Sequence, residues 1–264
     1  MADNKSKIKK FLSELTALKF TPWYRWHPQL ALRYLPVVEE IRKYRLTKAR
    51  GLTFRRADPI SIIEIGSGGL GIAPYLKMPV TGVDVRFEDP IHSLLKPVIG
   101  DAINLDFSDN SFDVVVSMDM LEHLSNKKRA KAISEMLRVA RKMVVVGAPC
   151  GDNARKQDKK LKEKYVKSRK KSFGFFEEHQ KYDLPVKEDI IQYIKQAAEV
   201  KRRNLEIIIK GNMNIKMREF LMKGWISERL LMNILFRKIF LLFIPIFRIL
   251  DRPPYYRQLF FIKL

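Results

Sequence analysis

Apolar residues in the central part of the chain fall into short runs that alternate with amphipathic segments. Strand-length runs occur at Ser61–Ile65, Val80–Asp84, Pro97–Ile99, Phe112–Ser117 and Met143–Gly147. Nearly continuous apolar runs of this length are typical of strands that are buried on both faces. Helical spacing between them predicts helices at Ile72–Lys77 and Lys127–Ala140. Strands that alternate with helices predict an α/β fold with a doubly wound, largely parallel sheet.

The segments on either side of this alternation carry further predicted elements. Lys5–Lys19 and Leu30–Leu46 have apolar residues at helical spacing, which predicts an N-terminal helical cap over residues 1–50. The remainder, residues 51–264, is predicted to form a single domain. Between Thr21 and Pro28 the chain has a proline-bounded aromatic cluster, which predicts a loop.

The C-terminal part predicts one more helix and two late strands. Lys187–Val200 has helical periodicity, whereas Leu205–Lys210 and Tyr256–Lys263 are apolar runs of strand length. Residues 151–181 are rich in Lys and poor in aliphatic residues, which predicts a basic loop or lid.

An apolar helical insertion is predicted at residues 212–254, between the two late strands. Within it Leu230–Leu250 is almost wholly apolar, but Arg237 and Lys238 interrupt it near the middle, which disfavours a bilayer span. A helix of this kind is suited to an anionic membrane surface. Packing against the domain and a dimer interface are the alternatives.

A glycine-rich turn follows the first predicted strand. Glu64 precedes the sequence Gly66-Ser67-Gly68-Gly69-Leu70-Gly71, and Asp84 ends the next strand. Glycines allow a positive φ and a close approach of the backbone to a ligand, and the following helix presents unpaired N–H groups. A carboxylate at the end of the second strand can accept hydrogen bonds from ribose hydroxyls. This pattern fits either a dinucleotide or S-adenosylmethionine.

Further motifs distinguish these two ligands. Gly100-Asp101-Ala102, Ser111-Phe112-Asp113 and Leu121-Glu122-His123 follow in order. With them, the segment from Ile60 to Pro149 resembles the class I S-adenosylmethionine-dependent methyltransferases, in the methyltransferase type 11-like branch. The resemblance implies a Rossmann-like sheet of seven strands, mostly parallel with an antiparallel last strand, and S-adenosyl-L-methionine as the cofactor.

The resemblance also implies which residues contact the cofactor. Asp84 is expected to bind the ribose, Asp101 the adenine amine, and Glu64 the methionine amino group directly or through water. The full expected set comprises Glu64, Gly66, Ser67, Gly68, Gly71, Asp84, Val85, Asp101, Ala102, Ser117 and Met118.

Two histidines are candidates for a catalytic base. His123 lies in the turn after the fourth strand, and His179 lies in the basic segment after the fifth. A histidine has a pKa near neutrality and can take a proton from a hydroxyl or an amine. Positioning of the acceptor is the alternative role for His123, and a local hydrogen bond is the alternative for His179. No Cys, His and carboxylate residues have the spacing of a metal site, so no metal is expected.

The net charge and the cysteine content bear on the partners and the location of the protein. The net charge of +22 favours attraction to a polyanion, with a generally Lys-rich composition as the alternative explanation. A single cysteine, Cys150, and an N-terminus without a signal sequence lead us to expect a cytoplasmic protein, peripheral at the membrane if the insertion binds there. The expected acceptor is a lipid-linked or glycan intermediate, with RNA or a small molecule as alternatives and a nicotinamide oxidoreductase as the least favoured function.

Overall fold

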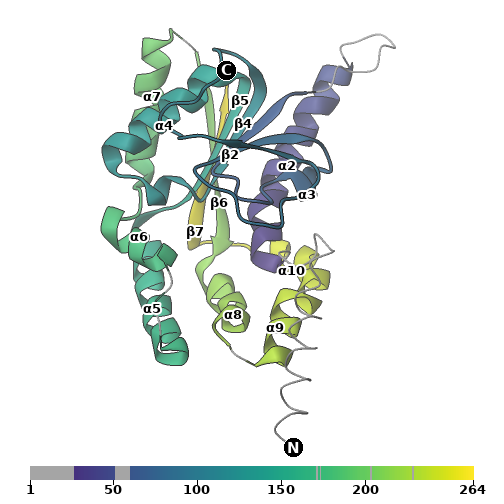
Figure 1. The fold of residues 1–264 in the computed structure, drawn as a ribbon, viewed down its shortest axis with the longest axis vertical. Helices are drawn as coiled ribbons and strands as arrows, with labels where there is room; N and C mark the ends of the chain where they lie inside the picture. The colour runs from purple at the N-terminus through teal and green to yellow at the C-terminus, as the bar shows by residue number, and fades with distance from the viewer. Residues whose placement is uncertain (1–26, 51–59, 171, 173, 203, 228) are drawn as a thin grey trace, which may run out of the picture.

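A seven-stranded sheet forms the centre of the protein, in the order β3-β2-β1-β4-β5-β7-β6 (Figure 1). The structure, a computed structural model, describes residues 27–50, 60–170, 172, 174–202, 204–227 and 229–264. The strands are β1 (Ile62–Ile65), β2 (Val80–Asp84), β3 (Leu95–Ile99), β4 (Phe112–Met118), β5 (Ala140–Pro149), β6 (Glu206–Asn214) and β7 (Tyr255–Lys263). Strands β1 to β5 pair in parallel, whereas β7 is antiparallel to both β5 and β6. The predicted Rossmann-like sheet with an antiparallel last strand is confirmed.

Helices cover both faces of the sheet because adjacent strand residues point to opposite sides. On one face, α2 (Pro28–Arg50) and α3 (Ala73–Leu76) pack against strand residues that include Ile62. On the other face, α4 (Asn126–Val139) and α7 (Lys187–Val200) pack against residues that include Ile63. The two layers lie on opposite sides of the sheet in Figure 1. This double burial explains why the strands are apolar at successive positions.

The remaining helices gather beyond the carboxyl ends of the parallel strands, at the lower end of Figure 1. They are α5 (Gly151–Arg169), α6 (Gly174–Tyr182), α8 (Ile215–Ile226), α9 (Leu230–Arg237) and α10 (Ile244–Ile249), with 3₁₀ turns η2 (Leu121–His123) and η3 (Ile239–Phe243). Ligands of doubly wound sheets bind at this end. The predicted helix Lys5–Lys19 and most of the aromatic cluster lie outside the described residues.

The prediction of a basic loop over residues 151–181 is wrong, because this segment forms α5 and α6. Its few apolar residues recur at helical spacing, and Ala154, Leu161 and Tyr165 are buried. Lysine is a good helix former, so the intervening lysines support the helix while their charged ends reach solvent. Composition suggested a loop, whereas the spacing of the sparse apolar residues dictated a helix.

The insertion is helical as predicted, but it is broken into short pieces rather than one continuous helix. Helix α9 ends at Arg237, and Pro245 stands in the first turn of α10 after η3. Phe240 packs on Phe220 and Phe236 within the insertion, and it also packs against a buried cluster that includes Leu32 of α2. Arg248 forms an ion pair with Glu39 of α2. One side of the insertion is therefore packed against the domain. No described helix has both the length and the apolar character required to span a bilayer.

Candidate functional site

The glycine-rich turn at the end of β1 has the backbone conformation that its sequence predicts. Gly66, Gly68 and Gly71 have φ angles of +77°, +53° and +52°, which residues that carry a Cβ rarely adopt. A Cβ at Gly66 would lie 2.7 Å from the side chain of Met120. At Gly68, by contrast, no atom lies within 4 Å of the Cβ position, so the space above this part of the turn is open.

Glu64 supports the turn from beneath. Its side chain is fully buried, and it accepts hydrogen bonds from the backbone N–H of Ile72 at 2.5 Å and from the hydroxyl of Tyr34 at 2.8 Å. Burial raises the pKa of Glu64 to about 7, although both hydrogen bonds favour the ionised carboxylate. The residue therefore joins β1, α2 and the start of α3 below the glycines.

A cavity of about 830 Å³ opens above this turn. The predicted cofactor residues that line it are Gly66, Ser67, Gly68, Gly71, Asp84, Val85, Asp101, Ala102 and Met118. Glu64 lies beneath the turn, and Ser117 is buried within β4, so neither of these two side chains is part of the lining. The structure thus brings most of the predicted set together around one cavity.

The lining of this cavity has the donors and acceptors that an adenosyl ligand requires. Asp84 is half-buried, and its Oδ2 accepts the Gly68 N–H at 2.9 Å, so one carboxylate oxygen is held by the turn. Asp101 is exposed at the end of β3, on the same rim. A volume of this size is typical of small-molecule and cofactor sites. The residues present therefore fit an adenosine-containing cofactor.

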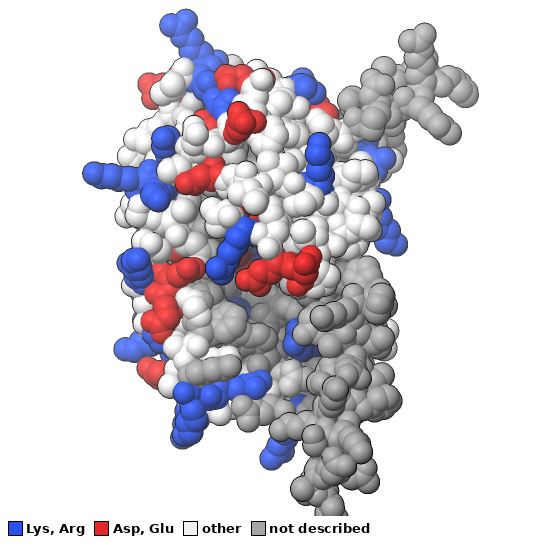
Figure 2. Space-filling view, viewed as in Figure 1, with Lys and Arg blue, Asp and Glu red and all other residues white. Residues whose placement is uncertain are grey.

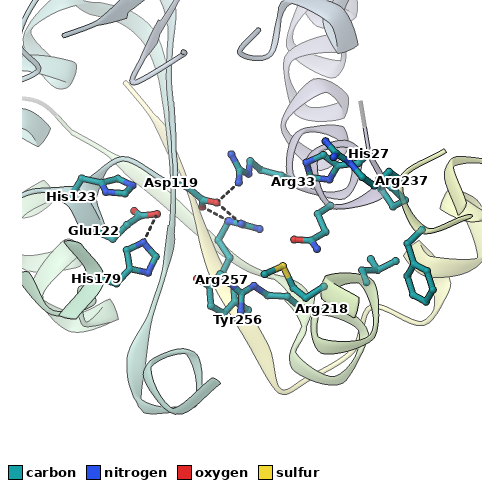
Figure 3. Close-up of a pocket in the computed structure, with 15 residues that line it drawn as sticks. His27, Arg33, Asp119, Glu122, His123, His179, Arg218, Arg237, Tyr256 and Arg257 are labelled. Carbon is teal, nitrogen blue, oxygen red and sulfur yellow. Dashed lines mark hydrogen bonds and ion pairs between the residues drawn. The ribbon is translucent and has the colours of Figure 1, made fainter. Parts of the chain in front are cut away.

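A second cavity of about 340 Å³ adjoins the first (Figure 3). Its lining is highly charged and comes from α2, the end of β4, η2, α6, α8, α9 and β7. The residues that line both cavities are His27, Arg33, Asp119, His123 and Arg237. The two cavities therefore meet at the carboxyl end of β4, where a second substrate would face the cofactor.

Asp119 holds the centre of this junction. It directly follows β4, and its carboxylate forms ion pairs with Arg257 of β7 and with Arg33 of α2, the latter at 2.7 Å. Burial alone would raise the pKa of Asp119, but Arg257 and Arg33 hold it well below its ordinary value. Arg257 also donates to Asn212 of β6 at 2.9 Å. One carboxylate thus fixes two arginines at the floor of the second cavity.

A second group of charged and polar side chains surrounds His179. Its Nδ1 lies 2.8 Å from Oδ2 of Asp158, and the same oxygen accepts the Tyr256 hydroxyl at 2.9 Å. Arg218 forms an ion pair with Asp158 at 2.9 Å and stacks on the ring of Tyr256 at 3.5 Å. Burial would raise the pKa of Asp158, but Arg218 and His179 hold it below its ordinary value.

The two candidate base histidines lie close together, with ring centroids 5.4 Å apart. His123 Nδ1 lies 2.5 Å from Oε2 of Glu178, whereas Glu122 Oε1 lies 4.0 Å from Nε2 of His179. Burial, and then the neighbouring His179, lower the pKa of His123 below its ordinary value. Burial raises the pKa of Glu122 well above its ordinary value, and Asp119 adds to this.

Buried Arg129 fastens the two histidine-bearing elements to each other. Its Nε donates to the Leu121 carbonyl of η2 at 2.9 Å, and its Nη2 donates to the carbonyls of Tyr182, at 3.1 Å, and Asp183, just after α6. A guanidinium with several donors can satisfy carbonyl groups from two segments at once. Arg129 therefore helps to hold α6 against η2, together with the direct contact between His123 and Glu178.

The sequence did not identify several of these residues as parts of the site. Asp119 stands two residues before the Leu121-Glu122-His123 motif, and Arg257 is a charged residue in a largely apolar strand, so both left a signal. Asp158 and Arg218 are ordinary charged residues in helical segments, and only the packing of α5 against α8 brings them together.

Comparison with protein families identifies the domain that contains this site. Residues 63–146 match the model of a methyltransferase domain, and this segment holds the glycine-rich turn, Asp84, Asp101 and His123. The chain contains a class I S-adenosylmethionine-dependent methyltransferase domain. Its cofactor is S-adenosylmethionine, as the sequence resemblance implied.

The chain is also similar to many solved structures, and the three described here share little sequence identity with it. A Thermotoga maritima methyltransferase, described as a possible histamine N-methyltransferase, is 14% identical with a TM-score of 0.49, over 89% of this chain and 91% of that one. Magnesium protoporphyrin IX methyltransferase from Synechocystis is 10% identical with a TM-score of 0.44, over 86% and 82%. Phosphoethanolamine N-methyltransferase 2 of Haemonchus contortus is 17% identical with a TM-score of 0.44, over 84% and 52%. Among curated proteins, no relative matches this chain significantly.

The fold also brings together a group of side chains that sequence spacing did not indicate. The sequence contains no recognisable metal motif, yet Glu122, His123 and His179 place three potential ligand atoms within 4.8 Å of one another. They come from η2 and from α6, which are separated in the chain by α4, β5 and α5. Such a group forms only through tertiary packing.

Proposed function

We propose that the protein transfers a methyl group from S-adenosylmethionine to an oxygen or nitrogen atom of a polar acceptor bound in the second cavity. The observation that carries this proposal is the junction of the two cavities, which share Asp119 and His123. When bound, S-adenosylmethionine supplies an electrophilic methyl group on a sulfonium centre. The task left to the protein is to orient the acceptor and to accept its proton.

In this proposal the cofactor is held by the glycine-rich turn and two carboxylates. Asp84 binds the ribose, Asp101 binds the adenine amine, and the backbone at Gly66 and Gly68 lies against the ribose and methionine portion. Glu64 contributes by supporting the turn, because its carboxylate already accepts two hydrogen bonds in the protein. This assignment is supported by the common lining of the first cavity.

The charges of the second cavity favour an acceptor that carries an anionic group. Asp119 pairs with both Arg33 and Arg257 and so offsets only one of their two positive charges, whereas Asp158 offsets the charge of Arg218. Arg237 also lines this cavity, and no ion pair joins it to another described residue. A guanidinium in this position is suited to a phosphate or a carboxylate.

We further propose that this acceptor is a lipid-linked or glycan intermediate presented at a membrane face. Phe236 and Arg237 of α9 line the second cavity, and the same insertion exposes Leu231, Leu242 and Ile249, which are 81%, 80% and 70% exposed. Apolar side chains next to basic ones are suited to an anionic membrane surface. The acceptor cavity would then face the lipid.

RNA is the rival acceptor because of the net charge of the chain. In Figure 2, the Lys and Arg side chains of the face in view stand apart, with Asp and Glu between them. A nucleic-acid site is ordinarily a basic patch or stripe on one face. The charge distribution on this face therefore favours the membrane proposal over RNA.

Labelled methyl transfer tests the proposed function. The protein is incubated with S-adenosylmethionine labelled in its methyl group and with a cell extract separated into lipid, RNA and small-molecule fractions. We expect label in the lipid fraction, lost in the Asp84→Ala variant. Label in RNA or in water-soluble molecules would overturn the proposed acceptor, and no transfer to any fraction would overturn the proposed activity.

A further inference from the structure

We propose that Glu122, His123 and His179 bind a divalent transition-metal ion at the wall of the second cavity. The carboxylate and the two imidazoles offer three ligand atoms within 4.8 Å of one another. In Figure 3, Glu122 lies between the two imidazole rings, on the side of the cavity opposite Arg237. All three side chains line the cavity, so an ion bound to them would be accessible from it.

The distances between these atoms are close to those of a metal site. Bonds from zinc to imidazole nitrogen or carboxylate oxygen are about 2.0–2.2 Å, so two ligands of one tetrahedral ion lie roughly 3.5 Å apart. Glu122 Oε1 and His179 Nε2, at 4.0 Å, exceed this spacing by about 0.5 Å. All the separations are within 4.8 Å, so none has to shorten by more than about 1.3 Å, which rotations of the three side chains can provide.

Glu122 gives a second reason to expect an ion. Its side chain is only 1% exposed, and its Oε2 has no hydrogen-bond partner among the described residues. A buried carboxylate oxygen without a hydrogen-bond partner is unfavourable, whereas coordination to a cation compensates its charge. Arg33 and Arg257 act on this carboxylate only at a distance, because their ion pairs are with Asp119.

Both histidines have the outer hydrogen bonds that orient metal ligands. His179 Nδ1 lies 2.8 Å from Asp158, and His123 Nδ1 lies 2.5 Å from Glu178. Metal-binding histidines usually donate their other ring N–H to a carboxylate or a carbonyl, which fixes the tautomer and the direction of the ring. With Nδ1 held in this way, Nε2 is the ring atom in position to coordinate.

The ligand set indicates the class of ion. Two imidazole nitrogens and one carboxylate oxygen suit Zn²⁺, Mn²⁺, Fe²⁺ or Co²⁺, whereas Mg²⁺ and Ca²⁺ prefer oxygen ligands alone. Three protein ligands leave further coordination positions open towards the cavity. If the proposed function holds, an acceptor oxygen can occupy such a position, and the ion lowers its pKa so that the proton leaves more readily. The binding of the ion itself does not depend on that function.

Cobalt binding tests the site without any methyl acceptor. Protein without a histidine tag is treated with a chelator and titrated with Co²⁺, followed by calorimetry and visible absorption. We expect one ion per chain and ligand-field absorption bands. The chain has four histidines, so imidazole nitrogen NMR with Zn²⁺ should perturb the rings of His123 and His179 and leave those of His27 and His92 unchanged.

Variants locate the ion. Glu122→Gln and His179→Gln should each weaken Co²⁺ binding by about 10-fold or more, and Asp158→Asn, which changes the outer hydrogen bond, by about 10–100-fold. His92→Gln is the matched control, since His92 lies outside the cluster and its Nδ1 accepts the backbone N–H of Leu94. Equal affinity in the control and the wild type supports the site.

The results that contradict the proposal are distinct from those that contradict the proposed function. No Co²⁺ binding at millimolar concentration, or perturbation of other histidines in the wild-type NMR spectrum, would overturn the metal site. The wild-type spectrum gives this answer even if a variant fails to fold. Methyl transfer that persists in chelator-treated protein would overturn the catalytic role of the ion, whereas metal binding without any methyl transfer would overturn only the proposed activity.

Discussion

Tyr34 of α2 donates a hydrogen bond of 2.8 Å to Oε1 of Glu64, directly below the glycine-rich turn. The other oxygen of Glu64 accepts the N–H of Ile72, where the turn leads into α3. A helix that precedes the sheet in the chain is thereby joined to the first strand. A Cβ at Gly71 would collide with this carboxylate, so the glycine and the acid fit each other.

Replacement of Glu64 by Gln should change how stability depends on pH. Burial raises the pKa of Glu64 from 4.5 to about 7, so the folded protein binds this proton more tightly than the unfolded chain does. The resulting stability is fully present below pH 4.5 and is lost as pH rises through about 7. A difference of this size corresponds to about 3 kcal/mol. The free energy of unfolding of Glu64→Gln, relative to wild type, should therefore rise by about that amount from pH 4.5 to pH 8.

Urea unfolding of the cofactor-free protein at several pH values measures this difference. Glu88→Gln is the control, because Glu88 is an exposed carboxylate of the same type. Parallel stability curves for wild type and Glu64→Gln would show that the carboxylate of Glu64 remains ionised throughout this range.

Asp84 is the residue whose loss should affect cofactor binding most directly. Asp84→Ala should weaken S-adenosylmethionine binding by about 1–3 kcal/mol, because the hydrogen bonds to the ribose and the bond from Gly68 N–H are both lost. Asp84→Asn keeps an acceptor for Gly68 and should have an intermediate effect. Calorimetry with S-adenosylmethionine and its demethylated product gives both affinities.

Asp106→Ala is the matched control for this experiment, since Asp106 is exposed and does not line the cavity. If Asp84→Ala and Asp106→Ala bind S-adenosylmethionine with equal affinity, Asp84 does not contact the cofactor.

The parts of the fold that the sequence predicts are those that local patterns determine. Apolar runs mark the strands because both faces of the sheet are buried, and Gly66, Gly68 and Gly71 mark the turn because their φ angles are positive. Residues 151–169 form a helix rather than the predicted loop, because Ala154, Leu161 and Tyr165 recur on one helical face and become buried. A Lys-rich composition does not prevent this, since lysine is a good helix former.

The acceptor side of the site depends on contacts between distant segments, which local patterns do not contain. Glu122 and His179 approach each other because η2 packs against α6, and Arg129 helps to hold the two elements together. Asp119 and Arg257 meet because the last strand inserts between β5 and β6 rather than at the edge of the sheet. Neither contact has a signal in sequence spacing, since each depends on the order of the strands or on the packing of helices.

The ion pair between Asp119 and Arg257 should be a large contributor to stability. Arg257→Met leaves Asp119 with Arg33 alone in a buried site, and loss of one partner of a buried pair typically costs about 3–5 kcal/mol. Because Arg33 remains, we expect the low end of this range. Chemical unfolding at neutral pH measures the effect.

An exposed ion pair at the end of the same strand provides the control. Lys263 pairs with Glu206 at 3.0 Å with both side chains largely exposed, so Lys263→Met should change stability by less than about 1 kcal/mol. If Arg257→Met and Lys263→Met lower the free energy of unfolding by the same small amount, water replaces the lost ion pair of Asp119. The pair would then not hold β7 to β4.

Vesicle binding should distinguish the proposed role of the insertion from its alternatives. Arg237 lines both cavities, so a change of its charge would disturb the site as well as any membrane contact. The exposed Leu231 and Leu242 are better targets, because each is at least 80% exposed on the insertion. We expect the wild type to sediment with anionic vesicles and much less with neutral ones, and the double variant Leu231→Gln/Leu242→Gln to remain in the supernatant.

Val200→Gln is the matched control, since Val200 is 81% exposed at the end of α7, on the opposite end of the molecule from the insertion. It should sediment like the wild type. Sedimentation velocity without vesicles gives the oligomeric state of each variant. A wild-type dimer that the leucine substitutions dissociate, together with no binding to anionic vesicles, would identify the exposed side of the insertion as a subunit interface. Lipid and a second copy of the chain would cover the same leucines. A membrane surface therefore predicts vesicle binding by a monomer, whereas a subunit interface predicts a dimer that does not bind vesicles.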